Sequence, residues 1–478
     1  MYYVGIDLGT SSVKMILCDK NGKIINTITR DYLISFPYEG YSEQSPEDWY
    51  EKVIEGLEML TTGVGDKVKA LSIAGQMHGL VMLDEFDNVI RPCILWNDSR
   101  SVKECEILNS EKMLPEWTGN IAFPGFTAPK ILWVKNNEKE NFEKCRKIML
   151  PKDYVVYRLT GEFVTEMSDA AGMLLFDVKN KCYSKEMLEI CQIEEKMLPK
   201  VLESYLCCGK VKKSIAEKLG WGDVKVAPGA GDNAAAAIGM GVIGDGGCSI
   251  SLGTSGTVFV SSEEYKKLEN NAIHFFNHAD GDYHMLGCML SAASCNKWWH
   301  EDILNDNSYS DEGLAADGES KVFFLPYLMG ERSPHNNPHL RGAFVGMSLD
   351  TTKAEMTKAV MEGVCYALRD CVEIAKSEGI KIDEVRLCGG GSKSEAWCRI
   401  LANVLKVRVV KPVCSEGPSF GAAILAMVAD GVYENVKSAC ESVVKMGETI
   451  EFDSEISKKY DKGYKRFKAL FESLKEWY

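Results

Sequence analysis

The first thirty residues alternate apolar runs with short polar turns. Residues 2–6 form an apolar run, residues 7–12 (DLGTSS) form a polar turn, and residues 13–17 return to apolar side chains. This alternation predicts a tight β-hairpin. Asn21-Gly22 is a strong hairpin turn, so a third antiparallel strand is expected over residues 23–30.

The tip of the first hairpin carries candidate chemistry. It offers backbone N–H groups, three hydroxyls and one carboxylate. Gly9 lets the backbone approach a ligand closely, and N–H groups with hydroxyls suit phosphate oxygens. Asp7, at the strand end, is suited to hold a metal that accompanies the phosphates, through water. The alternative is an ordinary hairpin with a hydroxyl-rich turn.

The same short motif returns in the second half of the chain. Leu8–Ser11 recurs as Leu252–Ser255, again between apolar runs. A repeated strand–turn–strand frame near the start of each half predicts two related halves that face one another across a nucleotide.

Two apolar runs lead into polar loops in the first half. Residues 69–74 form a strand-like run that ends at Gly75–Gly79, and residues 92–96 form another that ends at residues 97–100. Because α/β proteins bind ligands beyond strand ends, His78 is a candidate site residue, although a lone histidine is more often structural. Trp96 is suited to cover the apolar face of a sugar, although core packing is its commoner role.

Asp232 lies where a glycine-rich turn, residues 228–233, becomes an alanine-rich helix. An aspartate at this point is often only a helix cap. The turn has more glycine than a cap requires and the following side chains are small, so the carboxylate is expected to have open space around it. Residues 239–244 fit GxGxxG, but they follow a helix and not a strand, which argues against a dinucleotide site.

The second half, from about Asp245, repeats the alternation of strands, polar loops and helices. A strand over residues 384–387 ends in three glycines, Gly389–Gly391, which let a flat ring or a phosphate lie against the backbone. Helices are expected at residues 45–60, 130–137, 291–299, 352–377 and 393–405, from residue 417, and at residues 454–478.

Composition narrows the functional class. A chain of 478 residues is too long for one core, so two domains are the default. The net charge is −14 and no Lys/Arg cluster is visible, which argues against nucleic acid and anionic membranes as partners. The 17 cysteines are scattered without a CxxC pair, which predicts reduced thiols in a cytoplasm. No uninterrupted apolar run of about 18 residues is present, so no membrane span is expected.

Taken together, the two hairpin tips, the GxGD turn and the GGG turn resemble the sugar-kinase/actin/heat-shock ATPase superfamily, and within it the FGGY carbohydrate kinases. Residues 125–137 fit the first FGGY signature, and residues 342–347 with the following helix fit the second. The stretches IAGQMHG, ILWNDSR, MSDAAG and LPYLMGERSPHNNP look like the bacterial xylulokinase branch. The resemblance runs from about residue 3 to residue 425.

The resemblance implies an α/β fold of two ribonuclease-H-like domains facing across a central cleft. Residues 1–244 would form the N-terminal domain, with the sugar site, the first phosphate hairpin and the catalytic aspartate. Residues 245–478 would form the C-terminal domain, with the second phosphate hairpin and the adenosine pocket. The implied reaction is transfer of the γ-phosphoryl group of ATP to the 5-hydroxyl of D-xylulose, with Mg²⁺ and domain closure. Family habit suggests a homodimer.

By motif position, the resemblance also implies residue roles. Asp232 is the expected base, and Asp7 is the expected metal-associated acid. The expected sugar-binding residues are Met77, His78, Asp232 and Asn233, to which the loop argument adds Trp96. The expected nucleotide-binding residues, with Lys14 where glycerol kinases carry arginine, are Thr10, Ser11, Ser12, Lys14, Gly253, Thr254, Asn296, Gly390, Gly391 and Glu395.

Two alternatives remain at this point. Another FGGY kinase, acting on ribulose, gluconate or fuculose, would share the phosphate-handling residues and differ only in the loops at residues 75–79 and 96–100, both of which favour xylulose. An actin- or heat-shock-like ATPase would release ADP without sugar and has no use for these two loops.

Overall fold

The computed structural model describes residues 1–268, 271–309 and 314–477, which divide into two compact units. Unit 1 comprises Met1–Ile243, Phe275–Tyr283 and Glu416–Val444, and unit 2 comprises Gly244–His274, His284–Ser415 and Lys445–Tyr478. The sequence prediction divided the chain once, between residues 244 and 245. In the structure, two segments that lie after this division, Phe275–Tyr283 and Glu416–Val444, belong to unit 1.

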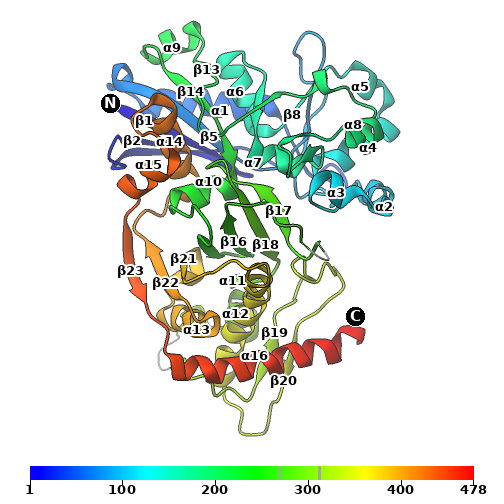
Figure 1. Ribbon diagram of the computed structural model, residues 1–478, viewed down its shortest axis with the longest axis vertical. Helices are drawn as coiled ribbons and strands as arrows, with labels where there is room; N and C mark the ends of the chain where they lie inside the picture. The colour runs from blue at the N-terminus through cyan, green and yellow to red at the C-terminus, as the bar shows by residue number, and fades with distance from the viewer. Residues whose placement is uncertain (269–270, 310–313, 478) are drawn as a thin grey trace. The chain divides into compact units, whose positions relative to one another are not determined.

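Unit 1 is built on a six-stranded sheet in the order β13-β14-β5-β1-β2-β3 (Figure 1). Strands β1 and β2 form the predicted antiparallel hairpin, while β5 runs parallel to both β1 and β14. The bounds of these strands are β1 Tyr2–Leu8, β2 Ser12–Asp19, β3 Ile24–Asp31, β5 Val68–Gly75, β13 Gly209–Lys210 and β14 Lys225–Gly231.

Helices cover the sheet of unit 1. Helix α1 (Pro46–Leu60) has proline in its first turn and buries Trp49, Val53 and Leu57 at helical spacing, so it packs on β2 and β3. Helix α14 (Gly417–Asp430) packs on β1, β5 and β14. The central strands are therefore buried, as expected of parallel strands.

The packing of α14 explains why residues 416–444 belong to unit 1. A Cβ atom at Gly5 of β1 would lie 1.8 Å from the Ser419 carbonyl oxygen of α14. A Cβ atom at Gly421 would lie 1.8 Å from the Ala235 carbonyl oxygen of α10 (Asp232–Gly239). These glycines let backbone contact backbone, so α14 lies directly against both β1 and α10.

A seven-stranded sheet has the order β17-β18-β16-β15-β21-β22-β23, and its strands β16, β15, β21, β22 and β23 lie wholly in unit 2. Strands β15 and β16 form the second predicted hairpin, and β21 runs parallel to β15. The bounds of these strands are β15 Cys248–Leu252, β16 Gly256–Ser262, β17 His274–Asn277, β18 Tyr283–Met289, β21 Glu384–Cys388, β22 Arg408–Pro412 and β23 Met446–Ile450.

The remaining elements surround the two sheets. Those of unit 1 are β4 Glu43–Gln44, β6 Val81–Leu83, β7 Cys93–Ile94, α2 Val102–Ser110, α3 Leu114–Thr118, α4 Thr127–Asn137, α5 Lys139–Lys144, β8 Lys147–Met149, α6 Pro151–Thr160, β9 Val164–Glu166, α7 Met167–Ala170, β10 Phe176–Asp177, β11 Cys182–Tyr183, α8 Lys185–Cys191, β12 Lys200–Leu202, α9 Lys213–Leu219 and α15 Val436–Val443. Those of unit 2 are α11 Ala293–Trp298, β19 Phe323–Leu325, β20 Ala343–Val345, α12 Lys353–Ser377, α13 Glu395–Leu405 and α16 Ser454–Leu474. The predicted last helix ends earlier than expected, and Tyr478 lies outside the described residues.

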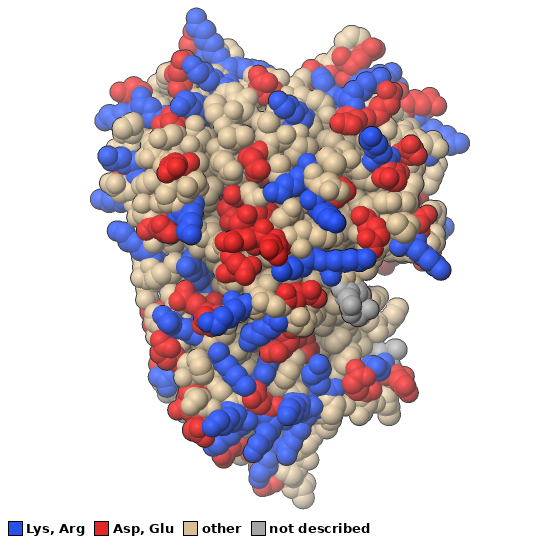
Figure 2. All heavy atoms as spheres, in the orientation of Figure 1, with Lys and Arg blue, Asp and Glu red and all other residues tan. Residues whose placement is uncertain are grey.

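Figure 2 shows one face of the surface, on which Lys and Arg side chains are interspersed with Asp and Glu side chains. Among the described residues, we find no helix with the length and apolar character needed to cross a membrane.

Candidate active site

Three parallel strands of unit 1 end at the same edge of the sheet. Leu8 of β1 pairs with Gly75 of β5, and Gly75 pairs with Gly231 of β14. The residues that follow these strand ends therefore gather at one edge, where open α/β sheets bind ligands. This register brings the first hairpin tip, the loop containing His78 and the turn containing Asp232 together.

The hairpin tip in unit 1 is fixed by hydrogen bonds. The Gly9 N–H donates to the Ser12 carbonyl oxygen at 3.0 Å, which closes the turn. Trp96 Nε1 donates to Thr10 Oγ1 at 3.0 Å, so the indole, which stays 40% exposed, is held against the tip. Gln44 Nε2 donates to the Thr10 carbonyl oxygen at 2.6 Å. The tip is therefore preorganised, with Thr10 attached to two other segments of unit 1.

Two buried glutamines that we did not single out in the sequence support this tip. Gln44 Oε1 accepts hydrogen bonds from Trp49 Nε1 at 3.1 Å and from Gln76 Nε2 at 3.0 Å. Because Gln44 also donates to Thr10, it links the hairpin tip to the end of β5. A buried amide next to an apolar run is a recognisable sequence signal, since buried polar groups need partners.

Asp232 does not cap its helix. It is the first residue of α10, the N-cap position belongs to Gly231, and no side-chain cap bond is formed there. Asp232 Oδ1 accepts instead from the Asn233 backbone N–H at 2.7 Å and from Asn233 Nδ2 at 2.9 Å. Burial raises the pKa of Asp232 to about 6, against the opposing effect of the Asn233 hydrogen bonds. A carboxylate with this pKa is well suited to accept a proton near neutral pH.

Asp7 is a second half-buried carboxyl group with a raised pKa. Burial and then the charge of Asp232 raise the pKa of Asp7 to about 7, while Lys14 opposes this shift. The Lys14 ammonium is itself paired with Glu416, with Nζ and Oε2 3.0 Å apart. The two aspartates therefore have little compensating positive charge, and this arrangement favours a cation beside them.

A magnesium ion brought by a nucleotide fits this arrangement. Mg²⁺ commonly uses one or two carboxylates, waters and substrate phosphates instead of a cage of protein ligands. Over residues 1–268, 271–309 and 314–477, no three His, Cys, Asp or Glu side chains are grouped to hold a metal.

His78 has a strained backbone and a well-held ring. Its φ angle is 69°, in the left-handed region, and its Nδ1 lies 2.8 Å from the Gly172 carbonyl oxygen. Since a carbonyl only accepts, Nδ1 carries the proton and Nε2 is the acceptor of the neutral ring. The ring centroid lies 4.7 Å from that of Phe126. The Met77 side chain packs against Gly231: a Cβ atom added to Gly231 would lie 3.0 Å from Met77 Cγ.

Unit 2 contains a separate hollow of about 640 Å³ next to the second hairpin tip. Five residues predicted to bind nucleotide line it, namely Gly253, Thr254, Asn296, Gly390 and Gly391. Asn296 Oδ1 is buried and has no hydrogen-bond partner within the described part of the chain. An amide oxygen in this state suits a ligand that donates a hydrogen bond.

The glycine turn presents bare backbone to this hollow. Gly389 has a φ angle of 89°, and a Cβ atom there would lie 2.6 Å from the Leu252 carbonyl carbon. A Cβ atom at Gly390 would meet no atom within 4 Å, so this position faces open space. The open space at Gly390, which lines the hollow, leaves room for a flat ring beside this turn.

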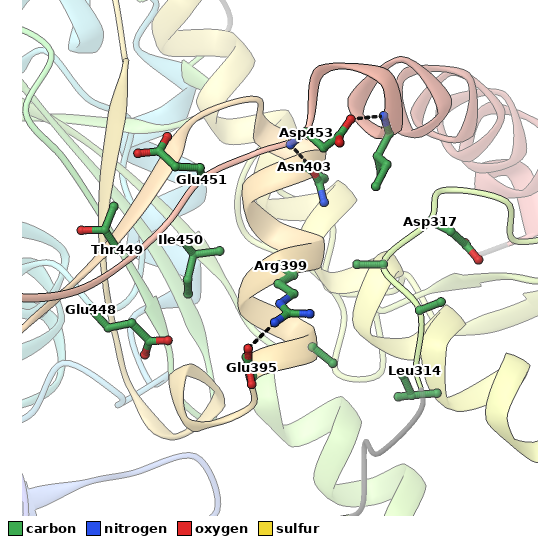
Figure 3. A pocket seen from close by; sticks show the side chains of 14 residues that line it. Leu314, Asp317, Glu395, Arg399, Asn403, Glu448, Thr449, Ile450, Glu451 and Asp453 are labelled. Carbon is green, nitrogen blue, oxygen red and sulfur yellow. Dashed lines mark hydrogen bonds and ion pairs between the residues drawn. The ribbon is translucent and has the colours of Figure 1, made fainter.

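Glu395 does not line that hollow. It lies in the wall of a different one of about 810 Å³, together with Arg399, Asn403 and residues of β23. Figure 3 shows Glu395 and Arg399 joined as an ion pair on one face of α13. A helix turns by about 100° per residue, so Glu395 and Arg399 share a face that Ser394 and Trp397, which line the 640 Å³ hollow, do not. We therefore leave Glu395 out of the nucleotide site.

The Glu395→Ala variant tests this separation. We expect the KM for the nucleotide to stay within about twofold of the wild-type value, because the exposed ion pair contributes little and lies outside the hollow. The matched variant Asn296→Ala should raise the KM for the nucleotide by about three- to tenfold, because this substitution removes a buried hydrogen-bond acceptor. A larger effect at Glu395 than at Asn296 would reverse the assignment.

Models of one protein family match both halves of the chain. Residues 2–239 match the profile of the FGGY family of carbohydrate kinases, N-terminal domain, and residues 248–429 match the C-terminal domain of the same family. A xylulose kinase from Escherichia coli (strain K12) is 42% identical over 440 residues, which cover 89% of this chain and 90% of that protein.

Solved structures show the same fold. A crystal structure described as a xyloylose kinase from Brucella ovis has a TM-score of 0.96 and 37% identity, and covers 100% of both chains. A gluconate kinase from Lactobacillus acidophilus has a TM-score of 0.93 and 26% identity, and the match covers 99% of this chain and 98% of that one.

Proposed function

Because this chain belongs to the FGGY family of carbohydrate kinases, we propose that it transfers the γ-phosphoryl group of ATP to the 5-hydroxyl of D-xylulose. The name of the Escherichia coli relative supports this substrate. The proposal rests on the arrangement at one edge of the unit 1 sheet. Asp232, with its raised pKa, follows strand β14, and β14 is in register with β5, the strand that leads to His78.

In the proposed reaction, Asp232 accepts the proton of the sugar hydroxyl as that oxygen attacks the γ-phosphorus. The bond between the γ-phosphorus and the β,γ-bridging oxygen breaks, and ADP leaves. Phosphoryl transfer depends on positioning and charge neutralisation more than on covalent chemistry. A base with a pKa of about 6 is largely ionised at pH 7 and still able to take up a proton.

The two hairpin tips have the proposed role of holding phosphates. Thr10, Ser11, Ser12 and Lys14 would contact them from unit 1, and Gly253 with Thr254 from unit 2. Asp7 would hold Mg²⁺ through water, and the ion would neutralise phosphate charge when bound. Asn296 and the Gly390–Gly391 backbone would contact the adenosine.

Sugar-dependent ADP release over a panel of ketopentoses, polyols and aldonic acids tests the proposal. We expect strong activity on D-xylulose and little on the others. Preference for gluconate would instead favour the activity named for the Lactobacillus acidophilus structure. Equal ADP release without any sugar would contradict the kinase proposal altogether.

The His78→Ala variant is expected to raise the KM for D-xylulose about tenfold and leave the KM for ATP unchanged, because Nε2 is proposed to accept a hydrogen bond from a sugar hydroxyl. Steady-state kinetics with each substrate varied in turn measure this split.

The variant His78→Asn separates the ring from the backbone, since asparagine tolerates the left-handed conformation. His339→Ala, at an exposed histidine of unit 2, is the matched control and should behave as wild type. An unchanged sugar KM in His78→Ala would remove this residue from the sugar site.

A further inference from the structure

Unit 1 contains a lysine whose ammonium group has an unusual set of partners. Lys130 of α4 is 0% exposed, and its Nζ donates to the His78 carbonyl oxygen at 2.9 Å and to the Gly125 carbonyl oxygen at 2.7 Å. Across the described residues, it forms no ion pair with a carboxylate, and Asp98, whose charge opposes the effect of burial on the pKa of Lys130, is paired with Arg100 instead. Burial lowers the pKa of Lys130 to about 7. The N–H donors of a buried amino group are therefore satisfied here by neutral backbone oxygens, an arrangement that demands fixed geometry.

The first of these carbonyl groups belongs to the strained residue of the candidate sugar loop. The His78 carbonyl oxygen also accepts from Thr127 Oγ1 at 3.1 Å, so two side chains from the first turns of α4 hold one peptide group. A left-handed φ at a non-glycine residue persists only when its surroundings enforce it. Lys130 and Thr127 supply this restraint on the main-chain side of His78.

The second carbonyl group connects Lys130 to the loop that contains Trp96. A Cβ atom at Gly125 would lie 2.6 Å from the Trp96 carbonyl oxygen, so the two backbones are in direct contact. Lys130 therefore fixes the His78 peptide relative to Gly125, and Gly125 packs against the Trp96 backbone. From the sequence, these two loops, at residues 75–79 and 96–100, are the ones expected to differ between FGGY kinases that act on different sugars.

We propose that Lys130 is a positioning residue for sugar recognition, acting through the His78 and Gly125 carbonyl groups and touching neither substrate. This inference rests on the proposed function, because it requires His78 to contact the sugar. If Lys130 sets the direction in which the His78 ring is presented, its loss moves the Nε2 acceptor away from the sugar hydroxyl. The nucleotide residues of unit 2 are unaffected by this change.

The Lys130→Met variant tests the inference, because methionine keeps much of the length and removes the N–H donors. We expect the KM for D-xylulose to rise about tenfold or more, with the KM for ATP within about twofold and kcat changed less than the sugar KM. Lys130→Gln keeps two N–H donors on a shorter side chain and should fall between wild type and Lys130→Met. A lysine that only stabilises the fold would lower the amount of active enzyme and leave both KM values unchanged.

Two further variants keep the test decisive. Thr127→Val removes one donor to the same carbonyl group with almost no change of volume, and should raise the sugar KM about threefold even if Lys130→Met does not fold. Lys225→Met is the control: this partly exposed lysine at the opposite end of β14 pairs with the Asp430 carboxylate at 3.0 Å and donates to the Asp430 backbone oxygen at 3.2 Å, and its loss should leave the sugar KM unchanged.

The outcomes separate the inference from the function on which it rests. If the wild-type protein shows no sugar-dependent ADP release, the proposed function fails and the inference fails with it. If the wild-type protein phosphorylates D-xylulose but Lys130→Met and Thr127→Val keep its sugar KM, only the inference is overturned.

Discussion

Replacing Asp232 with asparagine is expected to lower kcat by about 10²- to 10⁴-fold, the range attributed to a positioned proton acceptor. The amide has nearly the same shape, and its oxygen still accepts the hydrogen bonds from Asn233, so the turn at the start of α10 should keep its structure. The KM for ATP should change little because the adenosine contacts are proposed to lie in unit 2. Steady-state ADP release measures both quantities.

The pH dependence provides a second readout for Asp232. Because burial raises its pKa to about 6, the base takes up a proton as the pH falls below that value. The kcat/KM of the wild-type enzyme should therefore decrease as the pH falls below about 6. The residual activity of Asp232→Asn should not show this decrease, because the amide does not take up a proton. Asp223→Asn, at a carboxylate paired with Lys210 on the surface of unit 1, is the control and should keep both rate and pH profile. A kcat within tenfold of wild type in Asp232→Asn would show that another group accepts the proton.

The Gly421→Val variant is expected to destabilise unit 1 by about 3 kcal/mol or more, because the added side chain has no room. A Cβ atom at this position would lie 1.8 Å from the Ala235 carbonyl oxygen and 3.0 Å from the Gly239 backbone nitrogen. Both obstacles are backbone atoms, so no rotamer change relieves the clash and α14 must move away from α10. Urea unfolding, with hydrogen exchange of the α10 and α14 amides, measures the effect.

Gly222→Ala is the matched control for this prediction. A Cβ atom at Gly222 would meet nothing within 4 Å, so alanine should leave the stability nearly unchanged. If Gly421→Val unfolded at the same urea concentration as wild type, the close crossing of α10 and α14 would not be important for stability. Because Asp232 begins α10, we also expect Gly421→Val to lose activity at temperatures where the fold persists.

The sequence predicted those features that depend on neighbouring residues. The β1–β2 hairpin follows from two apolar runs around a six-residue polar turn, and α1 follows from proline in the first turn and buried residues at helical spacing. The loop of His78 is recognisable because it follows an apolar run, and the turn of Asp232 because it is rich in glycine and leads into a helix of small side chains. Their meeting at one edge follows from the parallel register of β1, β5 and β14, which the structure supplies.

Features that depend on distant residues were not predicted. Gly5 and Gly421 are both visible in the sequence, but nothing local indicates that the strand of Gly5 packs directly on the helix of Gly421, or that this helix packs on α10. Lys130 lies in a recognised signature, yet its carbonyl partners depend on how α4 meets the His78 loop. The nucleotide role expected for Glu395 rests on its motif position in the family resemblance, and the helical rotation of α13 directs this side chain to the other hollow.

The late position of α14 in the chain has a consequence for synthesis. As the polypeptide leaves the ribosome, strands β1, β5 and β14 emerge early, but the helix that covers them emerges only after most of unit 2 has been translated. Until then, the apolar face that α14 covers has no partner, and such intermediates are prone to aggregation and dependent on chaperones. A premature stop before residue 416 therefore removes more than the end of the protein: it leaves the nascent N-terminal half unable to complete its core.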